Sequence, residues 1–277
     1  MSGSTLVSTA ELSRHLGQWR VFDCRHDLAR PDLGEQQYRA AHIPGAAFAH
    51  LDRDLSAPKT GKNGRHPLPN PESFIKWIEK NGLRPSDRVV CYDGGNGAMA
   101  ARLWWMLRWV GHDAVAVLDG GLAKWLKEGR PVSADIPSFK PSNFPLKLNA
   151  DAALSVDALQ KNLQNLLLVD ARAPVRYRGE QEPIDPIAGR IPGALNRFNA
   201  ENVSADGTFK PADQLKKDFR SLLGGRSPGE AIHYCGSGVA ACHNLLAMEI
   251  AGLPGARLYA GSWSEWSADP KRPQERG

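Results

Sequence analysis

The sequence has few cysteines, and they form no pattern that could build a scaffold. The four cysteines of the 277-residue chain are Cys24, Cys91, Cys235 and Cys242. They are too few for a disulfide-stapled fold, and no CxxC pair suggests a zinc site. No segment carries a motif that implies an organic cofactor. We therefore expect free thiols in a reducing cytoplasm, no metal and no cofactor, with at most one or two cysteines serving chemistry.

Long apolar runs and blocks of one charge are missing as well. No segment approaches the ~18 apolar residues of a membrane span, and the opening MSGSTLVSTAELSRHL has no apolar stretch of signal-peptide length. The net charge is +5, but no cluster of basic and aromatic residues marks a nucleic-acid surface. We expect neither a membrane nor a nucleic acid as a partner.

The chain does contain two copies of one plan. The runs RVFD, HIPGA, VVCYDG and VLDGGLAKW of the first half correspond to LLVD, RIPGA, IHYCG and LYAGSWSEW of the second half. The landmarks recur in the same order roughly 140 to 150 residues later, which indicates a duplicated domain. Between the copies, the prolines of residues 131–148 predict a semi-extended linker. We place the first domain at residues 1–145, including this linker, and the second at residues 146–277.

Within each copy, short apolar runs alternate with patterns typical of helices. The expected helices are residues 71–82, 98–111, 211–225 and 238–252, and the expected strands are residues 20–23, 88–92, 114–119, 166–170 and 231–235. This alternation predicts an α/β fold with a mainly parallel sheet in each domain. Ligand sites in such sheets gather at the carboxyl ends of strands, and Cys235 lies at one of these ends.

Cys235 begins a glycine-broken turn, CGSGVA, between an expected strand and an expected helix. Gly236 and Gly238 allow a tight turn, so that N–H groups of the loop, including those of Val239 and Ala240, can point at the sulfur close to a helix N-terminus. Such surroundings favour a thiolate, the nucleophilic form of cysteine. The alternative is a cysteine that only packs at the end of a strand.

The first copy provides an internal comparison for this loop. It has Asp93, in YDGGNGA, at the position that corresponds to Cys235. A carboxylate cannot carry a sulfur atom, so we expect one catalytic domain and one degenerate domain. The glycines that follow Asp93 lack the spacing and the lysine of nucleotide-binding loops, and we interpret them as a remnant of the same turn.

The doubled HIPGA-type motif, the CGSGVA loop and the terminal GSWSEW together resemble the two-domain rhodanese-type sulfurtransferases over residues 5–270. The resemblance implies tandem domains, each a three-layer α/β/α unit around a mainly parallel sheet. It also implies that Cys235 takes a sulfane sulfur from a small anionic donor as a persulfide. The acceptor would be a thiol, such as thioredoxin or glutathione, or cyanide.

The loop is similar to that of mercaptopyruvate-type members of this family. Gly236 and Ser237 stand where thiosulfate-preferring members carry two basic residues. The resemblance implies a proton relay of Ser237, His66 and Asp52, which would assist C–S cleavage or deprotonate an acceptor. Asp54 is the alternative to Asp52 as the acidic member of this relay. The alternative for His66 is that it is an ordinary loop histidine with no part in the relay.

The expected donor-binding residues depart in part from the family pattern. Arg176 matches the substrate arginine, whose planar guanidinium suits a carboxylate or a sulfonate. Ile184 stands where mercaptopyruvate-type members usually have a second arginine. Arg190 replaces the usual histidine of the second HIPGA-type motif and either compensates for that loss or is a surface residue. Ala240 stands where threonine is common, so the donor is left open, with 3-mercaptopyruvate favoured over thiosulfate.

Two other functions agree less well with the sequence. A cysteine-based phosphatase normally ends its loop with C-x5-R, but Ala241 occupies the place of that arginine. A non-catalytic binding protein would be consistent with the loss of the cysteine in the first copy. The intact loop around Cys235 argues against it.

Overall fold

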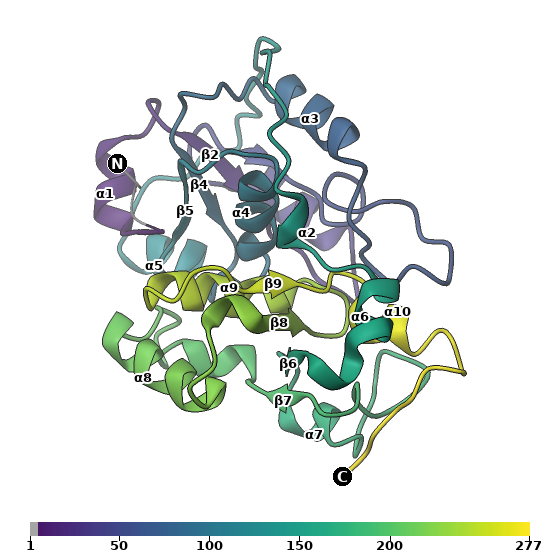
Figure 1. The fold of residues 1–277 in the computed structure, drawn as a ribbon. Helices are drawn as coiled ribbons and strands as arrows, with labels where there is room; N and C mark the ends of the chain where they lie inside the picture. Colours follow the sequence, from purple (N-terminus) through teal and green to yellow (C-terminus); the bar gives the residue numbers. More distant parts are fainter. Residues whose placement is uncertain (1–4) are drawn as a thin grey trace. The chain divides into compact units, whose positions relative to one another are not determined.

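The computed structural model describes residues 5–277, which form two units (Figure 1). The first unit contains residues 5–57, 69–149 and 203–209, and the second contains residues 58–68, 150–202 and 210–277. Segment 58–68 thus packs with the second unit, although the residues on either side of it belong to the first. Segment 203–209 packs with the first unit, although the residues on either side of it belong to the second. No helix within residues 5–277 is both long enough and apolar enough to cross a membrane.

The first unit is built around a parallel sheet of five strands in the order β1-β5-β4-β2-β3. These strands are β1 (Leu6–Val7), β2 (Arg20–Asp23), β3 (Ala47–Phe48), β4 (Val89–Tyr92) and β5 (Val115–Leu118). All residues of β4 and β5 are buried, as expected for central strands that are covered on both faces.

Helices cover both faces of this sheet. They are α1 (Thr9–Arg14), α2 (Leu33–Ala40), α3 (Pro71–Lys80), α4 (Ala100–Trp109) and α5 (Gly121–Lys127). Val21, Val90 and Tyr92 share one core cluster with Leu12 of α1 and Trp125 of α5. Helices α3 and α4 pack on the other face, because the ring of Trp77 in α3 contacts that of Phe22 in a tilted arrangement and α4 contacts β4 and β5. The expected α/β/α layering is therefore confirmed for this unit.

The start of α3 illustrates how the sequence fixes a helix end. The side chain of Asn70 accepts hydrogen bonds from the N–H groups of Glu72 and Ser73, and Pro71 occupies the first helical position. An N-cap side chain satisfies amides that have no partner inside the helix, and the fixed φ of proline suits its first turn.

The second unit has a parallel sheet of four strands in the order β7-β6-β8-β9. These strands are β6 (Leu167–Asp170), β7 (Leu195–Asn196), β8 (Ala231–Tyr234) and β9 (Arg257–Leu258). A single parallel bridge between Ala153 and Leu258 extends the sheet beyond β9. This bridge corresponds to the pairing of β1 with β5 in the first unit.

Helices also cover both faces of the second sheet. The α-helices are α6 (Val156–Asn162), α7 (Pro174–Tyr177), α8 (Ala212–Leu223), α9 (Ala240–Ile250) and α10 (Ser262–Trp266), and the short 3-10 helices are η1 (Ala150–Ala152), η2 (Leu163–Asn165), η3 (Asn199–Asn202) and η4 (Pro228–Glu230). Leu159 of α6 and Trp263 and Trp266 of α10 join one core cluster on the sheet. Helix α9 packs on β8 and β9, and α8 packs on α9.

In each sheet, an aspartate at the end of one strand forms an ion pair with the arginine two residues after it. The Arg25 guanidinium contacts the Asp23 carboxylate at 2.6 Å, and that of Arg172 contacts Asp170 at 2.7 Å. Each arginine also donates to the carbonyl directly before the HIPGA-type motif, Arg25 to Ala41 and Arg172 to Gly189. These buried pairs tie a strand end to the next loop, which is the structural role that their positions suggest.

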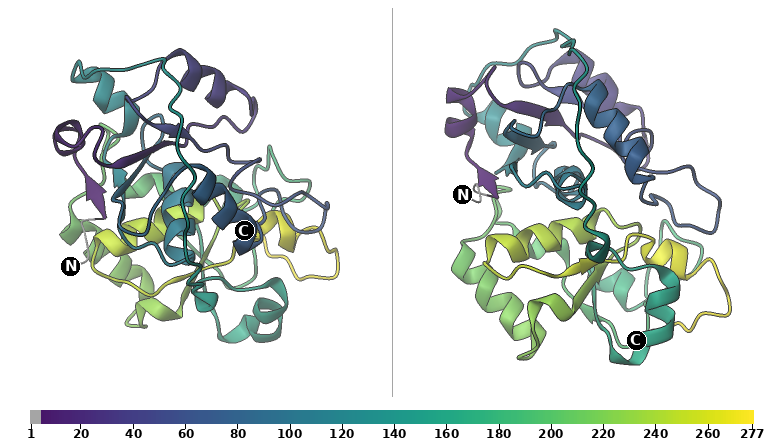
Figure 2. Two further views of the ribbon diagram at one scale, coloured as in Figure 1. Left: turned by 90° about the horizontal axis from the view of Figure 1, so that it is seen from above. Right: turned by 45° about the horizontal axis from the view of Figure 1, so that its top comes forward.

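The last helix of each unit carries a tryptophan that makes the same hydrogen bond to the segment after the helix. The indole N–H of Trp125 donates to the carbonyl of Pro131 at 2.8 Å, and that of Trp266 donates to Pro273 at the same distance. Beyond Pro131, residues 134–149 contain neither helix nor strand and run as an extended tube in both views of Figure 2. The expected semi-extended linker is therefore present.

Candidate active site

The Cys235 sulfur lies in a cradle of backbone amides at the end of β8. The N–H groups of Gly238 and Ser237 point at Sγ, with N–S distances of 3.1 and 3.4 Å. Val239 is the N-cap of α9 and Ala240 is its first residue. Within residues 5–277, no further hydrogen bond reaches this sulfur. Two of the expected loop amides therefore form the cradle, and they favour a negative charge on the sulfur.

Helix α10 holds the Cys235 loop from the other side. The Ser262 hydroxyl accepts the N–H of Cys235 at 3.1 Å and donates to the carbonyl of Tyr259. Ser262 has φ +57°, which makes it the one described residue other than glycine in the left-handed region. Such a conformation costs about 1–3 kcal/mol and typically occurs at functional sites. No sequence pattern around Ser262 predicted this strain.

Backbone hydrogen bonds complete this support. The N–H groups of Trp263 and Ser264 donate to the carbonyls of Cys235 and Gly236, each at 3.0 Å. Gly238 has φ +78°, and a Cβ at this residue would lie 2.4 Å from the carbonyl oxygen of Ala260. The loop is thus locked against the start of α10, and only glycine fits at position 238.

The structure brings Ser237 and His66 together. The Ser237 hydroxyl lies 2.8 Å from Nδ1 of His66, and both side chains are buried. His66 belongs to segment 58–68, which packs within the second unit. A hydroxyl and an imidazole in contact can exchange a proton.

Asp52 belongs to the first unit. Its carboxylate lies 3.8 Å from Nε2 of His26, and its N–H donates to Nδ1 of His50. The rival Asp54 accepts the N–H of His50 at 2.8 Å and pairs with Arg53, so it serves to hold the turn. The participation of Asp52 in a relay with His66 stays a prediction.

The side chains of His26, His50 and Asp52 form a cluster with the composition of a metal site. Nδ1 of His50, however, accepts the N–H groups of Asp52 and Arg53. In neutral imidazole the other nitrogen, Nε2, then carries the proton. A protonated nitrogen cannot bind a metal, so His50 is not arranged as a ligand.

Arg176 lies beside the cradle and is held by two carboxylates. Its guanidinium contacts Glu182 at 2.6 Å and Asp185 at 3.2 Å. Burial disfavours the ionised form of Glu182, but hydrogen bonds from Arg176 and from the N–H groups of Asp185 and Ile184 outweigh this and lower the pKa of Glu182. Glu182 therefore remains a fixed negative charge behind Arg176.

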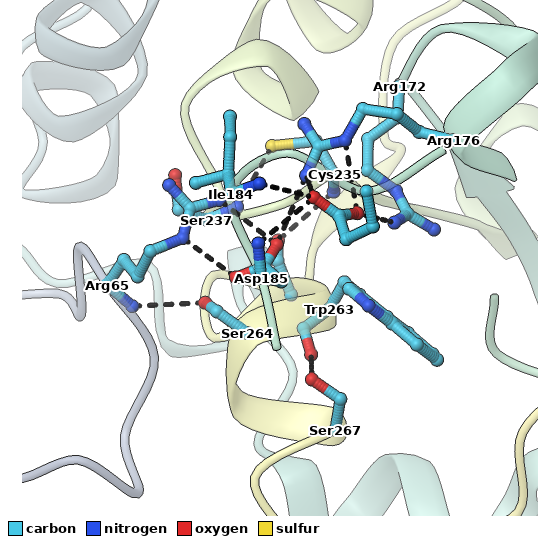
Figure 3. A network of polar contacts seen from close by, with 12 residues as sticks. Arg65, Arg172, Arg176, Ile184, Asp185, Cys235, Ser237, Trp263, Ser264 and Ser267 are labelled. Atoms are coloured by element: carbon cyan, nitrogen blue, oxygen red, sulfur yellow. Dashed lines mark hydrogen bonds and ion pairs between the residues drawn. The ribbon is translucent and has the colours of Figure 1, made fainter. Parts of the chain in front are cut away.

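A second guanidinium near the loop was missed from the sequence. Arg65 contacts Asp185 through Nε at 2.9 Å and Nη2 at 3.2 Å, and its backbone N–H donates to Ser264 (Figure 3). A Cβ on Gly236 would lie 2.5 Å from Nη2 of Arg65 and 3.4 Å from Nη2 of Arg176. The only signal in the sequence was its position directly before His66.

Arg190 lies in a different environment. Its guanidinium contacts the Glu275 carboxylate and the Gly277 carbonyl and stacks over Tyr177 at 4.4 Å. These contacts anchor the end of the chain and give no support to donor binding by Arg190. Ile184 is largely exposed, and its N–H donates to Glu182.

In the first unit, Asp93 fills the amide cradle that corresponds to the Cys235 loop. One carboxylate oxygen accepts the N–H groups of Gly95 and Gly97 at 2.9 and 3.0 Å. The other accepts those of Met99 and Ala100 at 2.8 and 3.2 Å. The same backbone turn thus directs N–H groups at the side chain of the residue that follows the strand in both units.

Comparisons with known proteins agree with this geometry. Two regions of the chain, residues 8–128 and 155–269, match the model of the rhodanese-like domain. The chain is 48% identical, over the full length of both proteins, to a Pseudomonas aeruginosa protein named "Probable 3-mercaptopyruvate sulfurtransferase". It is 35% identical to mouse thiosulfate sulfurtransferase, with 89% of this chain and 84% of that protein covered.

The fold is similar to that of a solved 3-mercaptopyruvate sulfurtransferase from Leishmania major. The TM-score is 0.88 at 30% sequence identity, and the match covers 99% of this chain and 76% of that chain.

Proposed function

Because the chain belongs to the rhodanese-like family and its relatives are sulfurtransferases, we propose that it transfers a sulfane sulfur from a small anionic donor through a persulfide on Cys235. The observation that carries this proposal is the pair of amides that donate to the Cys235 sulfur. They stabilise the thiolate that attacks the donor and the thiolate that is released when the sulfur leaves. We further propose that the first domain, with Asp93 at the corresponding position, carries no sulfur.

The first half-reaction forms a sulfur–sulfur bond and breaks a carbon–sulfur bond. The Cys235 thiolate attacks the sulfur of 3-mercaptopyruvate, and the electron pair of the C–S bond passes to carbon as an enolate. Protonation of this carbon gives pyruvate. The Ser237–His66 pair, at 2.8 Å, is suited to supply the proton.

The second half-reaction restores the enzyme. An acceptor thiolate attacks the outer sulfur of the persulfide, and the electron pair of the S–S bond returns to Cys235. A thiol acceptor leaves as a persulfide, and cyanide leaves as thiocyanate. Thioredoxin, glutathione and cyanide all remain predicted acceptors, and the cytoplasmic location also stays a prediction.

The need for a proton favours 3-mercaptopyruvate over thiosulfate. Sulfite leaves thiosulfate as a stable anion without protonation, whereas an enolate must gain a proton. A buried serine–histidine pair beside the cysteine therefore suits the first donor better. The name of the 48% identical relative supports the same choice.

Mass spectrometry of the protein after treatment with donor tests the persulfide. A single added sulfur on Cys235, absent in Cys235→Ser, is the expected result, and full turnover by Cys235→Ser would refute the mechanism. Ser237→Ala tests the choice of donor. It should lower kcat with 3-mercaptopyruvate by about 10²-fold and leave the thiosulfate reaction nearly unchanged. An equal loss with both donors would argue against the proton relay.

A further inference from the structure

Three side chains of the first unit form a cluster that no step described above uses. They belong to His26, His50 and Asp52, each of which places a ring nitrogen or a carboxylate oxygen within 4.8 Å of those of the other two. His26 follows β2 and His50 follows β3, and these two strands pair in parallel. Both imidazoles therefore lie at the carboxyl edge of the sheet, where functional groups gather in such folds.

The cluster belongs to the first copy of the duplicated fold alone. The ion pair of Asp23 and Arg25, which ties a strand end to the next loop, recurs in the second unit. All three residues of the cluster are replaced there by apolar ones, which are Ala173, Phe198 and Ala200. We expect a residue that only stabilises the shared fold to recur in both copies, as that ion pair does. The difference therefore points to a task that the first copy alone performs.

His50 fixes the backbone that carries Asp52. Its Nδ1 accepts the N–H groups of Asp52 and Arg53 at 3.2 and 3.3 Å. Its own N–H donates to the Asp54 carboxylate at 2.8 Å, and the residue is buried. Because the backbone is held in this way, Asp52 has little freedom beyond the torsions of its own side chain.

His26 lies against the carboxylate of Asp52. Nε2 of His26 is 3.8 Å from Oδ2 of Asp52, and the two side chains are 2% and 26% exposed. A ring nitrogen that turned its lone pair toward the carboxylate would be repelled, so Nε2 is the nitrogen that carries the proton. The distance exceeds that of a direct hydrogen bond. The attraction is therefore electrostatic, and burial of the imidazole strengthens it.

We infer that His26 is a positioning residue for sulfur transfer, because its Nε2–H group orients the carboxylate of Asp52. Asp52 is the predicted acidic member of the relay with Ser237 and His66, so this inference rests on the proposed function. His26 keeps its proton throughout and transfers none itself. A carboxylate that is held in one orientation and stays ionised is the group that such a relay needs behind its histidine.

Aromatic neighbours hold the ring of His26 in place. It meets the ring of His50 edge to face at a centroid distance of 5.6 Å, and His50 meets Phe48 in the same way at 6.1 Å. Phe48 in turn stacks on Tyr38 of α2 at 5.1 Å. The backbone before His26 is fixed by the N–H of Arg25, which donates to the carboxylate at the end of β2. His26 therefore provides a fixed point for the side chain of Asp52.

Three replacements of His26 test this inference through the single-turnover rate of persulfide formation. His26→Phe keeps the shape of the ring without the N–H group and should lower the rate with 3-mercaptopyruvate by about 10-fold. His26→Gln can place an amide N–H near the position of Nε2 and should retain most of the rate. His26→Asn is too short to do so and should behave as His26→Phe does. His15→Phe is the matched control, because His15 stacks on Trp19 in the same unit and its Nδ1 bonds to the carbonyl of Glu11.

A double variant shows whether His26 acts through Asp52. Asp52→Asn alone should lower the rate with 3-mercaptopyruvate by about 10²-fold. His26→Phe should add no further loss in that background, since residues that act as a unit are not additive. The leaving group of thiosulfate needs no proton, so His26→Phe should form the persulfide from thiosulfate at the wild-type rate. An equal loss with both donors, or losses that multiply in the double variant, would show a structural role and overturn the inference.

These measurements also distinguish the inference from the proposed function. If the wild-type protein forms no persulfide with either donor, the proposed function fails. If it forms the persulfide and His26→Phe matches His15→Phe, the proposed function stands and the role of His26 fails. A wild-type rate in Asp52→Asn also overturns the inference. Should His26→Phe not fold, His26→Gln and His26→Asn decide, and equal rates in these two variants count against the inference.

Discussion

Gly238 links the backbone conformation of the Cys235 loop to its chemistry. Its N–H donates to the sulfur at 3.1 Å, and its φ of +78° directs that N–H. Substitution by alanine places a Cβ 2.4 Å from the carbonyl oxygen of Ala260. This oxygen belongs to backbone that carries the start of α10, so it has little freedom to move away.

The expected loss of stability has two parts. An alanine in the left-handed region costs about 1–2 kcal/mol, and relief of the collision adds about 1–3 kcal/mol. Gly252→Ala is the matched control for the first part alone, because Gly252 has φ +67° and nothing lies within 4 Å of a Cβ there. We expect a loss of about 2–5 kcal/mol for Gly238→Ala and about 1–2 kcal/mol for Gly252→Ala.

Denaturant unfolding of the two variants, with an assay of persulfide formation, tests this reasoning. Gly238→Ala should also slow persulfide formation by about 10²-fold, as removal of one preorganised donor does elsewhere, whereas Gly252→Ala should keep the wild-type rate. Equal stability losses for the two variants would show that Ala260 does not constrain the loop. A wild-type rate in Gly238→Ala would show that its N–H is not needed at the sulfur.

Three further perturbations have definite expected outcomes. Burial lowers the pKa of His233 from its usual 6.5 to about 3, so the unfolded chain binds a proton that the folded chain does not as the pH falls between these values. The free energy of unfolding should therefore decline by up to about 1.4 kcal/mol per pH unit in this range. Denaturant midpoints measured against pH should decline less steeply for His233→Leu than for the wild type, and an equally steep decline in the variant would contradict this prediction. Asp93→Asn should lower the free energy of unfolding by about 1–3 kcal/mol, because an amide nitrogen cannot accept the N–H groups that one carboxylate oxygen now accepts. Sulfur transfer at Cys235 should stay at the wild-type rate in this variant, and loss of transfer would refute the degenerate role of the first domain. Ser262→Ala and Ser262→Gly both remove the hydroxyl, but only glycine relieves φ +57°, so thermal unfolding should find the glycine variant more stable by about 1 kcal/mol, and the reverse order would exclude strain at this position.

The sequence predicted those parts of the site that depend on local geometry. A strand, a glycine turn and a helix start follow one another within a few residues around Cys235, so their pattern is enough to predict amides around the sulfur. The contact between Ser237 and His66 was inferred differently. It joins residues 171 positions apart, and only the resemblance to a family indicated it before the structure gave a distance of 2.8 Å.

Other parts of the site depend on contacts that no local pattern encodes. Arg65 reaches Asp185 across 120 positions of sequence, and nothing in the residues around either one indicates the other. Arg190 shows the converse, because its motif suggested a functional place while its partner Glu275 lies 85 positions away. A charged side chain on a loop has several partners within reach, and the tertiary fold decides among them.

The two amide cradles allow one further step of reasoning. Asp93 and Cys235 follow equivalent strands, and each accepts backbone N–H groups from the turn after it. One domain holds a carboxylate there and the other a sulfur, so the capacity to stabilise an anion resides in the backbone turn rather than in either side chain. Among residues 5–277, four N–H groups donate to the Asp93 carboxylate and two donate to the Cys235 sulfur. A carboxylate spreads its charge over two oxygens, and each of them accepts two of these N–H groups. A thiolate concentrates its charge on one sulfur, so two N–H groups aimed at that single atom serve the same purpose in the second domain.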